Sequence, residues 1–179
     1  FESMSGQMPS DQWGMSTAAA KNRNWNASNV INAFFGPQAV YPGMAQTGEV
    51  AFKRSLYQSM IGQMLFLKTE IEGWRSQNVF GTTFWMYNEI WPTGGWGAIE
   101  YGNVGHTRGQ VVGGRAKPLQ YFLPTIFADV MATCGKGSGL AGDGDPFASD
   151  IPWGCYVKND SPRAFNGVVT VTAIDFASG

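Results

Sequence analysis

The stretch Gly81–Gly102, GTTFWMYNEIWPTGGWGAIEYG, decides how the rest of the chain can be interpreted. Its first part, within VFGTTFWMYNEIW, is short, aromatic and β-branched, which is the composition of a β-strand. Polar residues enter at the end of this run, with Asn88 and Glu89, and a Pro-Thr-Gly-Gly turn follows. In an α/β barrel the body of a strand packs in the interior and its C-terminal tip faces the ligand. The stretch therefore predicts a barrel strand that ends in a binding rim.

The residues before this stretch predict a long helix over 49–77. Glu49 and Arg75 carry the charges that suit the first and last turns of a helix. A second helix is predicted to start near Arg115 and to run through KPLQYFL. Residues 1–48 have no sustained period, which indicates loops with short helical turns. In the long helix, apolar side chains recur at the three- and four-residue spacing of one buried face: Leu56, Tyr57, Met60, Met64, Leu67, Ile71 and Trp74.

From about Ile126 the chain changes to short strand-like runs, namely IFADVMATC, GCYVKND and GVVTVTAIDF. Three such strands predict the opening of an immunoglobulin-like β-sandwich, and they are too few to close two sheets. The predicted fold class is therefore α/β plus β. Residues 1–125 are expected to form the C-terminal portion of a (β/α)8 barrel, and residues 126–179 the first strands of the sandwich. Both parts are expected to be pieces of a larger protein.

The composition argues against some classes of partner. The 179 residues include 44% hydrophobic and 14% charged residues, and the net charge is -1. No basic stripe is present, so we expect no nucleic-acid partner. No apolar run approaches the roughly 20 residues of a membrane helix, so we expect no membrane span. The first residues, FESMSGQMPS, lack the pattern of a signal peptide, and we expect Phe1 to lie within a longer polypeptide or at a processing site.

Cysteines and possible glycosylation sites indicate the compartment. Cys134 and Cys155 flank a Gly- and Asp-rich stretch that is typical of a loop. A disulfide closing this loop would stabilise the fold by roughly 3 kcal/mol through the unfolded state, and two buried free thiols are the alternative. Asn26 and Asn159 each begin an Asn-x-Ser sequence, the acceptor pattern for N-glycosylation. Together these features predict a secreted, extracellular or lysosome- or vacuole-like location.

The Gly81–Gly102 stretch, followed by GGRAKPLQYF and later by CYVKNDSP and NGVVTVTAIDF, resembles glycoside hydrolase family 2. The similar branch is that of the exo-acting β-mannosidases and exo-β-glucosaminidases. The resemblance covers residues 49–130 well and the sandwich strands more loosely. It implies retaining hydrolysis by two carboxylates about 5 Å apart, with no metal or organic cofactor. In the family both carboxylates precede this strand, so they are expected upstream of Phe1 and this chain alone is expected to be inactive.

The resemblance implies that Trp85 forms the floor of a pocket for a terminal β-linked sugar. An indole face matches the apolar face of a pyranose, and its N–H can donate to a hydroxyl. Asn88, Glu89 and Trp96 are predicted to bind the sugar at the same rim, and no residue of this chain is assigned a catalytic role. Alternatives remain open: Trp85 could be a barrel-core aromatic, and Glu89 and Glu100 could be structural ion pairs or the catalytic pair.

Two departures from the family pattern leave the sugar undefined. Ala116 stands where the family usually has Trp, and Gln120 where it often has His. The alternative function is therefore a non-catalytic structural or carbohydrate-binding protein built on the same scaffold. The expected partners are the sugar and the remainder of the polypeptide or a companion chain. His106, the single histidine, is interpreted as a surface residue, and the Asp143 and Asp145 turn is interpreted as solvated, so no metal site is predicted.

Overall fold

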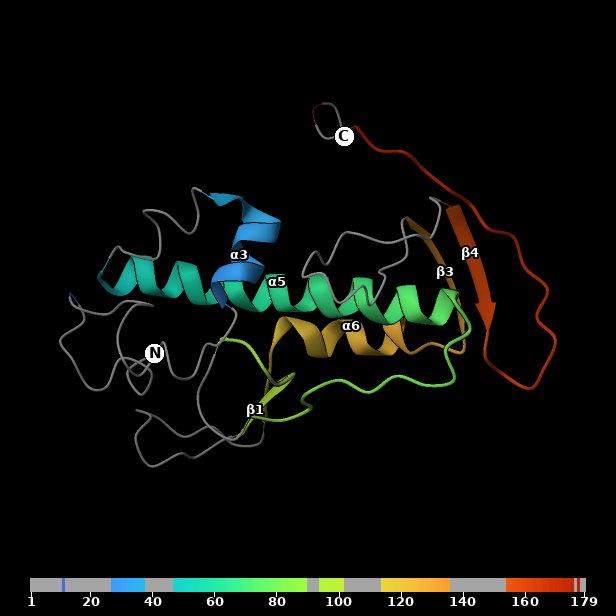
Figure 1. The fold of residues 1–179 in the computed structure, drawn as a ribbon, viewed down its shortest axis with the longest axis horizontal. Helices are drawn as coiled ribbons and strands as arrows, with labels where there is room; N and C mark the ends of the chain where they lie inside the picture. The colour runs from blue at the N-terminus through green and yellow to red at the C-terminus, as the bar shows by residue number, and fades with distance from the viewer. Residues whose placement is uncertain are drawn as a thin grey trace.

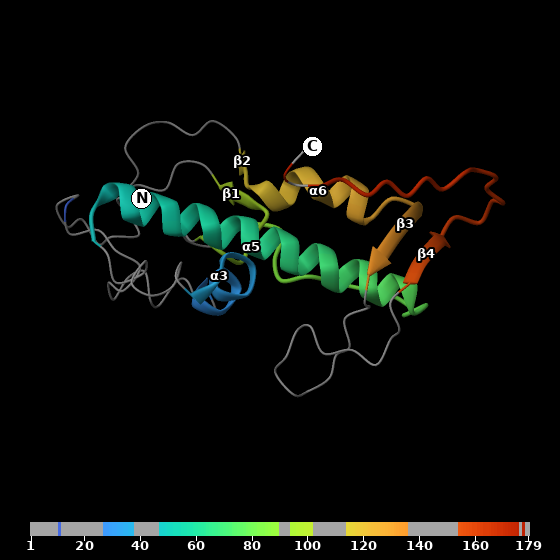
Figure 2. The same ribbon diagram turned by 90° about the horizontal axis from the view of Figure 1, so that it is seen from above.

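The computed structural model describes residue 11 and residues 27–37, 47–89, 94–101, 114–135, 154–175 and 177. In chain order the elements are α3 (Ala27–Phe35), α5 (Glu49–Ser76), β1 (Ile99–Tyr101), β2 (Gly114–Ala116), α6 (Pro118–Ile126), β3 (Val130–Gly135) and β4 (Gly154–Asn159). The long helix α5 forms the axis of the molecule, with α3 and α6 on opposite flanks (Figure 1). The β3–β4 hairpin lies at the C-terminal end of α5, as the view from above also shows (Figure 2).

The predicted long helix is confirmed as α5, which has 28 residues. Its buried face includes Phe52, Leu56 and Ile71, in agreement with the helical period. Tyr57 was expected on that face and this expectation is wrong, because the Tyr57 side chain is 59% exposed. The expectation of loops with short helical turns in residues 1–48 holds for α3, and most of that region lies outside the described residues.

One apolar cluster joins the two main helices to the segment between them. Met64 and Ile71 come from α5, Ala98 from the residues before β1, and Leu119 and Ile126 from α6. Fully burying an aliphatic side chain of this size stabilises a fold by about 1.5–3 kcal/mol. This cluster therefore fixes α6 and the turn before β1 on the same face of α5.

The second predicted helix begins later than expected. It starts at Pro118, and Gly114–Ala116 instead forms β2, which pairs antiparallel with β1. Proline suits the first turn of a helix because its missing N–H would have no partner there. Arg115 therefore lies in a strand directly opposite Glu100, and the two side chains form an ion pair at 2.5 Å.

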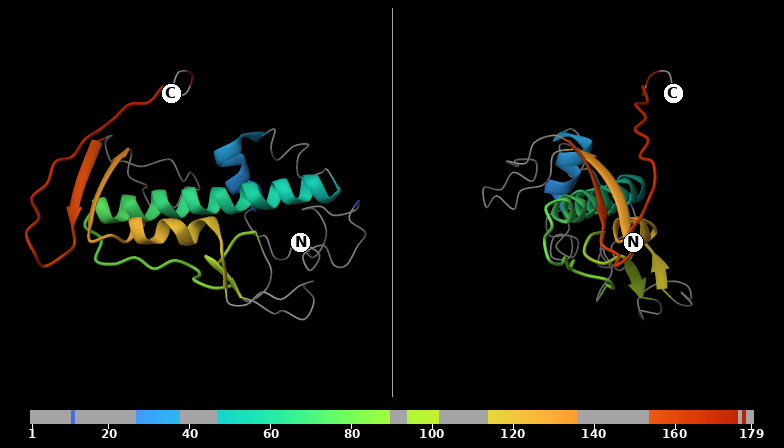
Figure 3. Two further views of the ribbon diagram at one scale, coloured as in Figure 1. Left: turned by 180° about the vertical axis from the view of Figure 1, so that it is seen from behind. Right: turned by 90° about the vertical axis from the view of Figure 1, so that its right-hand side faces the viewer.

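The predicted barrel strand is extended, but it does not form a strand ladder in the described residues. Residues 79–89 pair at their end, through an isolated parallel bridge between Asn88 and Ile99. The Met86 N–H also donates to the Trp96 carbonyl at 3.1 Å. A β-strand needs hydrogen-bonding neighbours along its length, and the described residues supply them at this one end. The described part of the chain contains mixed helices and two small sheets and no closed barrel (Figure 3).

The C-terminal region contains two of the three predicted strands. β3 and β4 form an antiparallel hairpin whose register runs from Val130↔Asn159 to Gly135↔Gly154. The expected third strand, within residues 167–175, is extended and exposed without a described strand partner. The sandwich and the domain division after residue 125 stay predictions. Among the described helices, none has both the length and the apolarity to cross a bilayer.

The predicted disulfide is confirmed. Cys134 and Cys155 lie directly opposite each other in the hairpin and are joined by a disulfide bond. The alternative of two free thiols is therefore wrong. The bond closes the connection between β3 and β4, and so it restricts the separation of the two strands.

Candidate functional site

Trp85 lies in the extended segment between α5 and β1 and presents most of its side chain to solvent. Its exposed fraction is 71%, and the peptide bond to Met86 is cis. Tyr87, two residues later, is half exposed on the same segment. An exposed indole offers a flat apolar face together with one N–H donor. Trp85 is thus not a core residue within the described structure, and it is free to contact a ligand or another part of a protein.

Asn88 and Glu89 end the segment beside β1. The Glu89 N–H donates to the Ile99 carbonyl at 2.9 Å, and the Ile99 N–H donates to the Tyr87 carbonyl at 3.0 Å. The Asn88 side-chain amide, which is partly buried, donates to the Glu89 carbonyl at 3.3 Å. The backbone pairing with β1 fixes where these two polar side chains lie.

Glu89 is a buried carboxylate with a buried cationic partner. It is 5% exposed, and its Oε1 accepts a hydrogen bond from the Gly97 N–H at 2.9 Å and one from the Lys117 ammonium. Lys117 is 6% exposed and also donates to the Gly95 carbonyl at 2.6 Å. Burial lowers the pKa of the Lys117 ammonium from 10.5 to about 7, whereas the adjacent carboxylate favours the charged form. The pair ties the turn at residues 94–97 to the start of α6.

The second carboxylate oxygen of Glu89 has a different environment. Oε2 is buried and has no hydrogen-bond partner among the described residues. A buried carboxylate oxygen without a donor is costly, and such atoms call for an explanation. Oε2 is therefore an acceptor that a buried water could satisfy.

The turn that carries Trp96 is held closely against the end of the segment. A Cβ placed on Gly97 would lie 2.8 Å from the Glu89 nitrogen, so this position requires glycine. Trp96 has a left-handed φ of 58°, and its carbonyl accepts a hydrogen bond from the Gln63 side chain at 2.6 Å. Gln63 thus anchors the turn to the middle of α5.

The structure brings three of the four predicted sugar-binding residues together. Asn88 and Glu89 lie beside the start of β1, Trp96 lies in the turn before it, and the Met86–Trp96 backbone hydrogen bond joins this turn to the residue after Trp85. The assignment of these residues to a sugar-binding rim stays a prediction. Glu100, considered as a catalytic partner of Glu89, pairs with Arg115.

Sequence reasoning missed the residues that hold this unit together. Lys117 precedes the helix proline and gives no local sign of a partner 28 residues away. Gln63 gave a weak signal, because a polar side chain stands there on the apolar face of a helix. Gly97 lies in a glycine-rich turn, where the glycine that is sterically required cannot be told from its neighbours.

Other candidate residues lie at the surface or outside the described residues. Asn26, His106, Asp143 and Asp145 fall outside them. Asn159 is exposed at the end of β4, where its Oδ1 accepts a hydrogen bond from the Ser161 hydroxyl at 2.7 Å. Its glycosylation stays a prediction.

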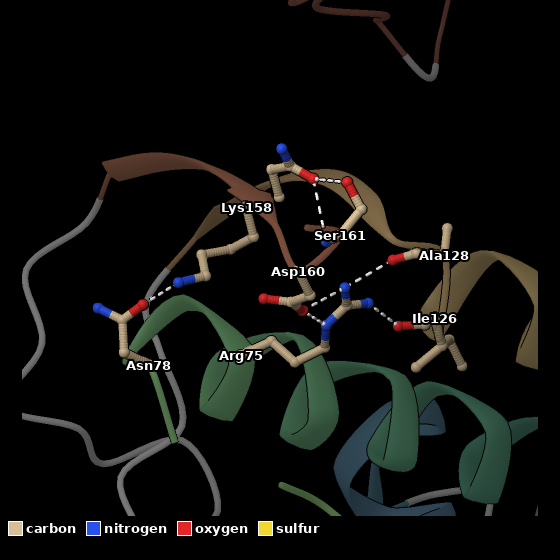
Figure 4. A network of polar contacts seen from close by, with 8 residues as sticks. Arg75, Asn78, Ile126, Ala128, Lys158, Asp160 and Ser161 are labelled. Carbon is tan, nitrogen blue, oxygen red and sulfur yellow. Dashed lines mark hydrogen bonds and ion pairs between the residues drawn. The ribbon is translucent and has the colours of Figure 1, made fainter. Parts of the chain in front are cut away.

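A second polar network lies at the C-terminal end of α5 (Figure 4). Arg75 is 9% exposed, and its Nε and Nη2 donate to Asp160 Oδ2 at 2.9 and 2.7 Å. The same guanidinium donates to the carbonyls of Ile126 and Ala128. One side chain therefore links α5 to the end of α6 and to the residue after β4.

Comparison with curated proteins shows sequence similarity over half of the chain. The chain is 31% identical over 99 residues to the β-mannosidase of Rattus norvegicus. This alignment covers 50% of the chain and 10% of the rat protein. The β-mannosidase of Capra hircus is 32% identical over 89 residues, covering 45% and 9%, and that of Mus musculus is 30% identical over 98 residues, covering 50% and 10%.

The chain spans about a tenth of the length of the curated relatives it matches, namely 10% of the rat protein and 9% of the goat protein. No family model matches the chain, and no solved structure matches it. The similarity agrees with the resemblance carried by the Gly81–Gly102 motif. Half of this chain is therefore related in sequence to β-mannosidases, which are glycoside hydrolases.

Proposed function

We propose that this chain is part of a retaining, exo-acting glycoside hydrolase that cleaves β-mannosides, and that it contributes one rim of the sugar pocket. The observation that carries the proposal is the similarity to mammalian β-mannosidases, at 31% identity over 99 residues for the rat protein. The names of these relatives favour a β-mannoside over a β-glucosaminide as the substrate. The disulfide supports the proposed secretory route, because such bonds persist in oxidising compartments.

The proposed rim divides its roles among four residues. The exposed Trp85 ring stacks on the apolar face of the terminal sugar, while Asn88 and Trp96 border the same opening. Glu89 supports the rim from beneath, because both of its carboxylate oxygens are buried and Oε1 accepts hydrogen bonds from Lys117 and from the Gly97 N–H. Lys117 contributes indirectly, because it holds Glu89 and the turn in place.

The catalytic carboxylates of the proposed enzyme lie elsewhere in the polypeptide. Retaining hydrolysis needs an acid/base and a nucleophile about 5–5.5 Å apart. Glu89 and Glu100 each have a cationic partner, and Glu89 is almost fully buried. Neither carboxylate has the free, paired arrangement that this chemistry requires.

The test uses the complete polypeptide that contains these 179 residues. We expect it to hydrolyse an aryl β-mannoside with a larger kcat/KM than an aryl β-glucosaminide. Trp85→Ala should lower kcat/KM by about tenfold or more, since an aromatic contact contributes about 0.5–1.5 kcal/mol beyond its buried area and 1.4 kcal/mol is tenfold. Tyr57→Ala, on the exposed side of α5, is the matched control and should leave kcat/KM unchanged.

The outcomes separate the proposal from its alternative. Turnover of the aryl β-glucosaminide in preference to the β-mannoside would refute the substrate, and full activity of Trp85→Ala would refute the pocket. Sugar binding without hydrolysis by the complete polypeptide would instead support a non-catalytic carbohydrate-binding protein. The departures at Ala116 and Gln120 are what favour that alternative.

A further inference from the structure

A hollow of about 470 Å³ opens at the C-terminal end of α5. None of the four predicted sugar-binding residues lines it. Gln63, which anchors Trp96, lies twelve residues before Arg75 on the same helix, a distance of about 18 Å at 1.5 Å per residue. The hollow therefore has a different set of lining residues from the Trp85 rim, although Thr82 of its lining lies three residues before Trp85 on the same extended segment. Its volume falls within the roughly 300–1,000 Å³ of small-molecule sites in proteins.

The walls come from three different parts of the fold, beside Arg75 of α5 itself. Asn78 and Phe80 follow α5, Phe127 and Asp129 lie between α6 and β3, and Lys158 and Asp160 lie at the end of β4. Figure 4 shows Lys158 and Asp160 above the end of α5, with the Lys158 ammonium directed to Asn78 and the Asp160 carboxylate directed to Arg75.

The hollow is held by contacts that do not depend on a ligand. Arg75, nine-tenths buried, binds Asp160 and the carbonyls of Ile126 and Ala128 from beneath. The Asp160 N–H donates to the Asp129 carbonyl at 2.8 Å, which joins the two acidic residues of the wall. A binding site whose walls are fixed in advance loses less conformational entropy when the ligand binds.

The charges of the wall select the class of ligand. The positive charges of Lys158 and Arg75 balance the negative charges of Asp129 and Asp160. An anion or a cation would therefore be attracted by two groups of the wall and repelled by the other two. A neutral ligand with several hydroxyls can donate to the carboxylates and accept from the ammonium group and from the Asn78 amide. The wall thus offers both hydrogen-bond donors and acceptors while its charges balance, and this combination favours a neutral ligand with several hydroxyls.

Two phenyl rings complete the recognition surface. The Phe80 side chain is fully exposed and the Phe127 side chain is 42% exposed, and both line the hollow. Aromatic rings bind apolar C–H surfaces, and a pyranose presents such a face together with hydroxyls at its edge. We propose that this hollow is a second carbohydrate site, which binds a neutral saccharide without taking part in hydrolysis.

The test measures binding, not turnover, so that it does not depend on the proposed enzyme activity. The complete polypeptide is titrated calorimetrically with a neutral, sulfur-linked β-disaccharide of mannose, which a glycoside hydrolase does not cleave, and separately with the corresponding disaccharide of glucose. We expect a saturable site that Phe80→Ala weakens at least tenfold and that Trp85→Ala leaves intact. Asp129→Asn, which keeps the size of the side chain, should weaken the same site. Val50→Ala, at an exposed position on the first turn of α5, is the control.

The hydrolysis assay then separates the two sites. Phe80→Ala should leave kcat/KM for an aryl β-mannoside unchanged, whereas Trp85→Ala should lower it. Absence of a second saturable site, or a site that is insensitive to both Phe80→Ala and Asp129→Asn, overturns the inference. Protection of Phe80 from solution-phase radical labelling in the free polypeptide overturns it as well, since another part of the protein would then cover the hollow.

Discussion

The buried pair of Glu89 and Lys117 is the residue-level feature on which the candidate rim depends. The exposed fraction is 5% for Glu89 and 6% for Lys117, and each side chain has a further hydrogen bond with the turn at residues 94–97. Removing two charges from water is expensive, and a buried charge that loses its partner is left uncompensated. Removing one partner therefore has consequences far larger than the loss of one hydrogen bond.

At about pH 6, below the lowered pKa of Lys117, Lys117→Met should destabilise the fold by about 3–5 kcal/mol, because it leaves the Glu89 carboxylate buried without a cation. The double variant Lys117→Met/Glu89→Gln should recover part of that loss. Urea unfolding followed by tryptophan fluorescence gives both free energies, and Lys53→Met, which breaks an exposed ion pair with Glu49, is the control. Equal effects of Lys117→Met and Lys53→Met would contradict a buried pair.

The lowered pKa of Lys117 also predicts a pH dependence. Its pKa is 10.5 in the unfolded chain and about 7 in the folded one, so between these values the unfolded state binds more protons. Stability rises with pH wherever the unfolded state binds more protons. The free energy of unfolding should therefore increase between pH 7 and pH 10 more steeply in the wild type than in Lys117→Met. Parallel pH profiles of the two proteins would contradict the lowered pKa.

The element-level contacts differ on the two flanks of α5. On one flank α3 crosses at Gly62, where a Cβ would lie 2.5 Å from Val30 Cγ1 and 3.3 Å from the Val30 carbonyl oxygen. At the C-terminal end of α5, polar side chains hold the β3–β4 hairpin: Arg75 binds Asp160, and Glu72 Oε2 accepts a hydrogen bond from the Thr133 hydroxyl at 2.9 Å. Close packing therefore holds α3 against α5, whereas polar and charged contacts hold the β3–β4 hairpin against α5.

Gly62→Ala should be destabilising by about 1–3 kcal/mol, which is the usual cost of overpacking. This outweighs the gain of about 1 kcal/mol in helix propensity that alanine brings. Gly81→Ala is the steric control, since a Cβ there meets nothing within 4 Å. Thermal unfolding of the three proteins measures the effect, and a more stable Gly62→Ala would show that α3 does not cross there.

Arg75→Met should cost about 3 kcal/mol, because it leaves the carbonyls of Ile126 and Ala128 and the Asp160 carboxylate without their donor. Hydrogen exchange should then accelerate in β3 and β4 and remain slow in the middle of α5. Lys158→Met removes one exposed contact, with Asn78, and should change stability by less than about 1 kcal/mol. Unchanged exchange in the hairpin of Arg75→Met would contradict its role at the junction.

At the scale of the whole molecule, large apolar side chains are exposed on several elements. They include Val50 on α5, Tyr121 on α6, Val157 on β4, and Val168 and Val171 near the C-terminus. Extensive exposed apolar surface is typical of regions that contact other protein or ligand. It supports the proposal that the chain works within a longer polypeptide.

The disulfide is a whole-molecule constraint because it closes a connection with a sequence separation of 21 residues. Cys134→Ala/Cys155→Ala should lower the free energy of unfolding by about 3 kcal/mol, the loop-closure value for a connection of this size. Adding a reductant should lower the stability of the wild type by the same amount and leave the double variant unchanged. A reductant effect on the double variant would show that the loss comes from another source.

Local patterns predicted the features whose causes are local. The apolar period over 49–77 predicted α5 to within one residue, and short strand-like runs predicted β3 and β4. The spacing of Cys134 and Cys155 around a loop predicted the disulfide. The third sandwich strand and the ladder of residues 79–89 were predicted from the same kind of pattern, but a strand forms only with a neighbour. The composition of a segment predicts its tendency to form a strand, and the presence of hydrogen-bonding neighbours decides whether the strand forms.

The sequence by itself determined the helix, the hairpin strands and the motif that points to β-mannosidases, because each depends on residues close together in the chain. Only the tertiary structure decided that Glu89 is buried against Lys117, that Gln63 anchors Trp96, and that Arg75 joins α5 to the hairpin. These partners are separated by 28, 33 and 85 residues. Long-range pairs of this kind form because burial leaves a charged or polar group without water, and it must then find a partner wherever the fold brings one close.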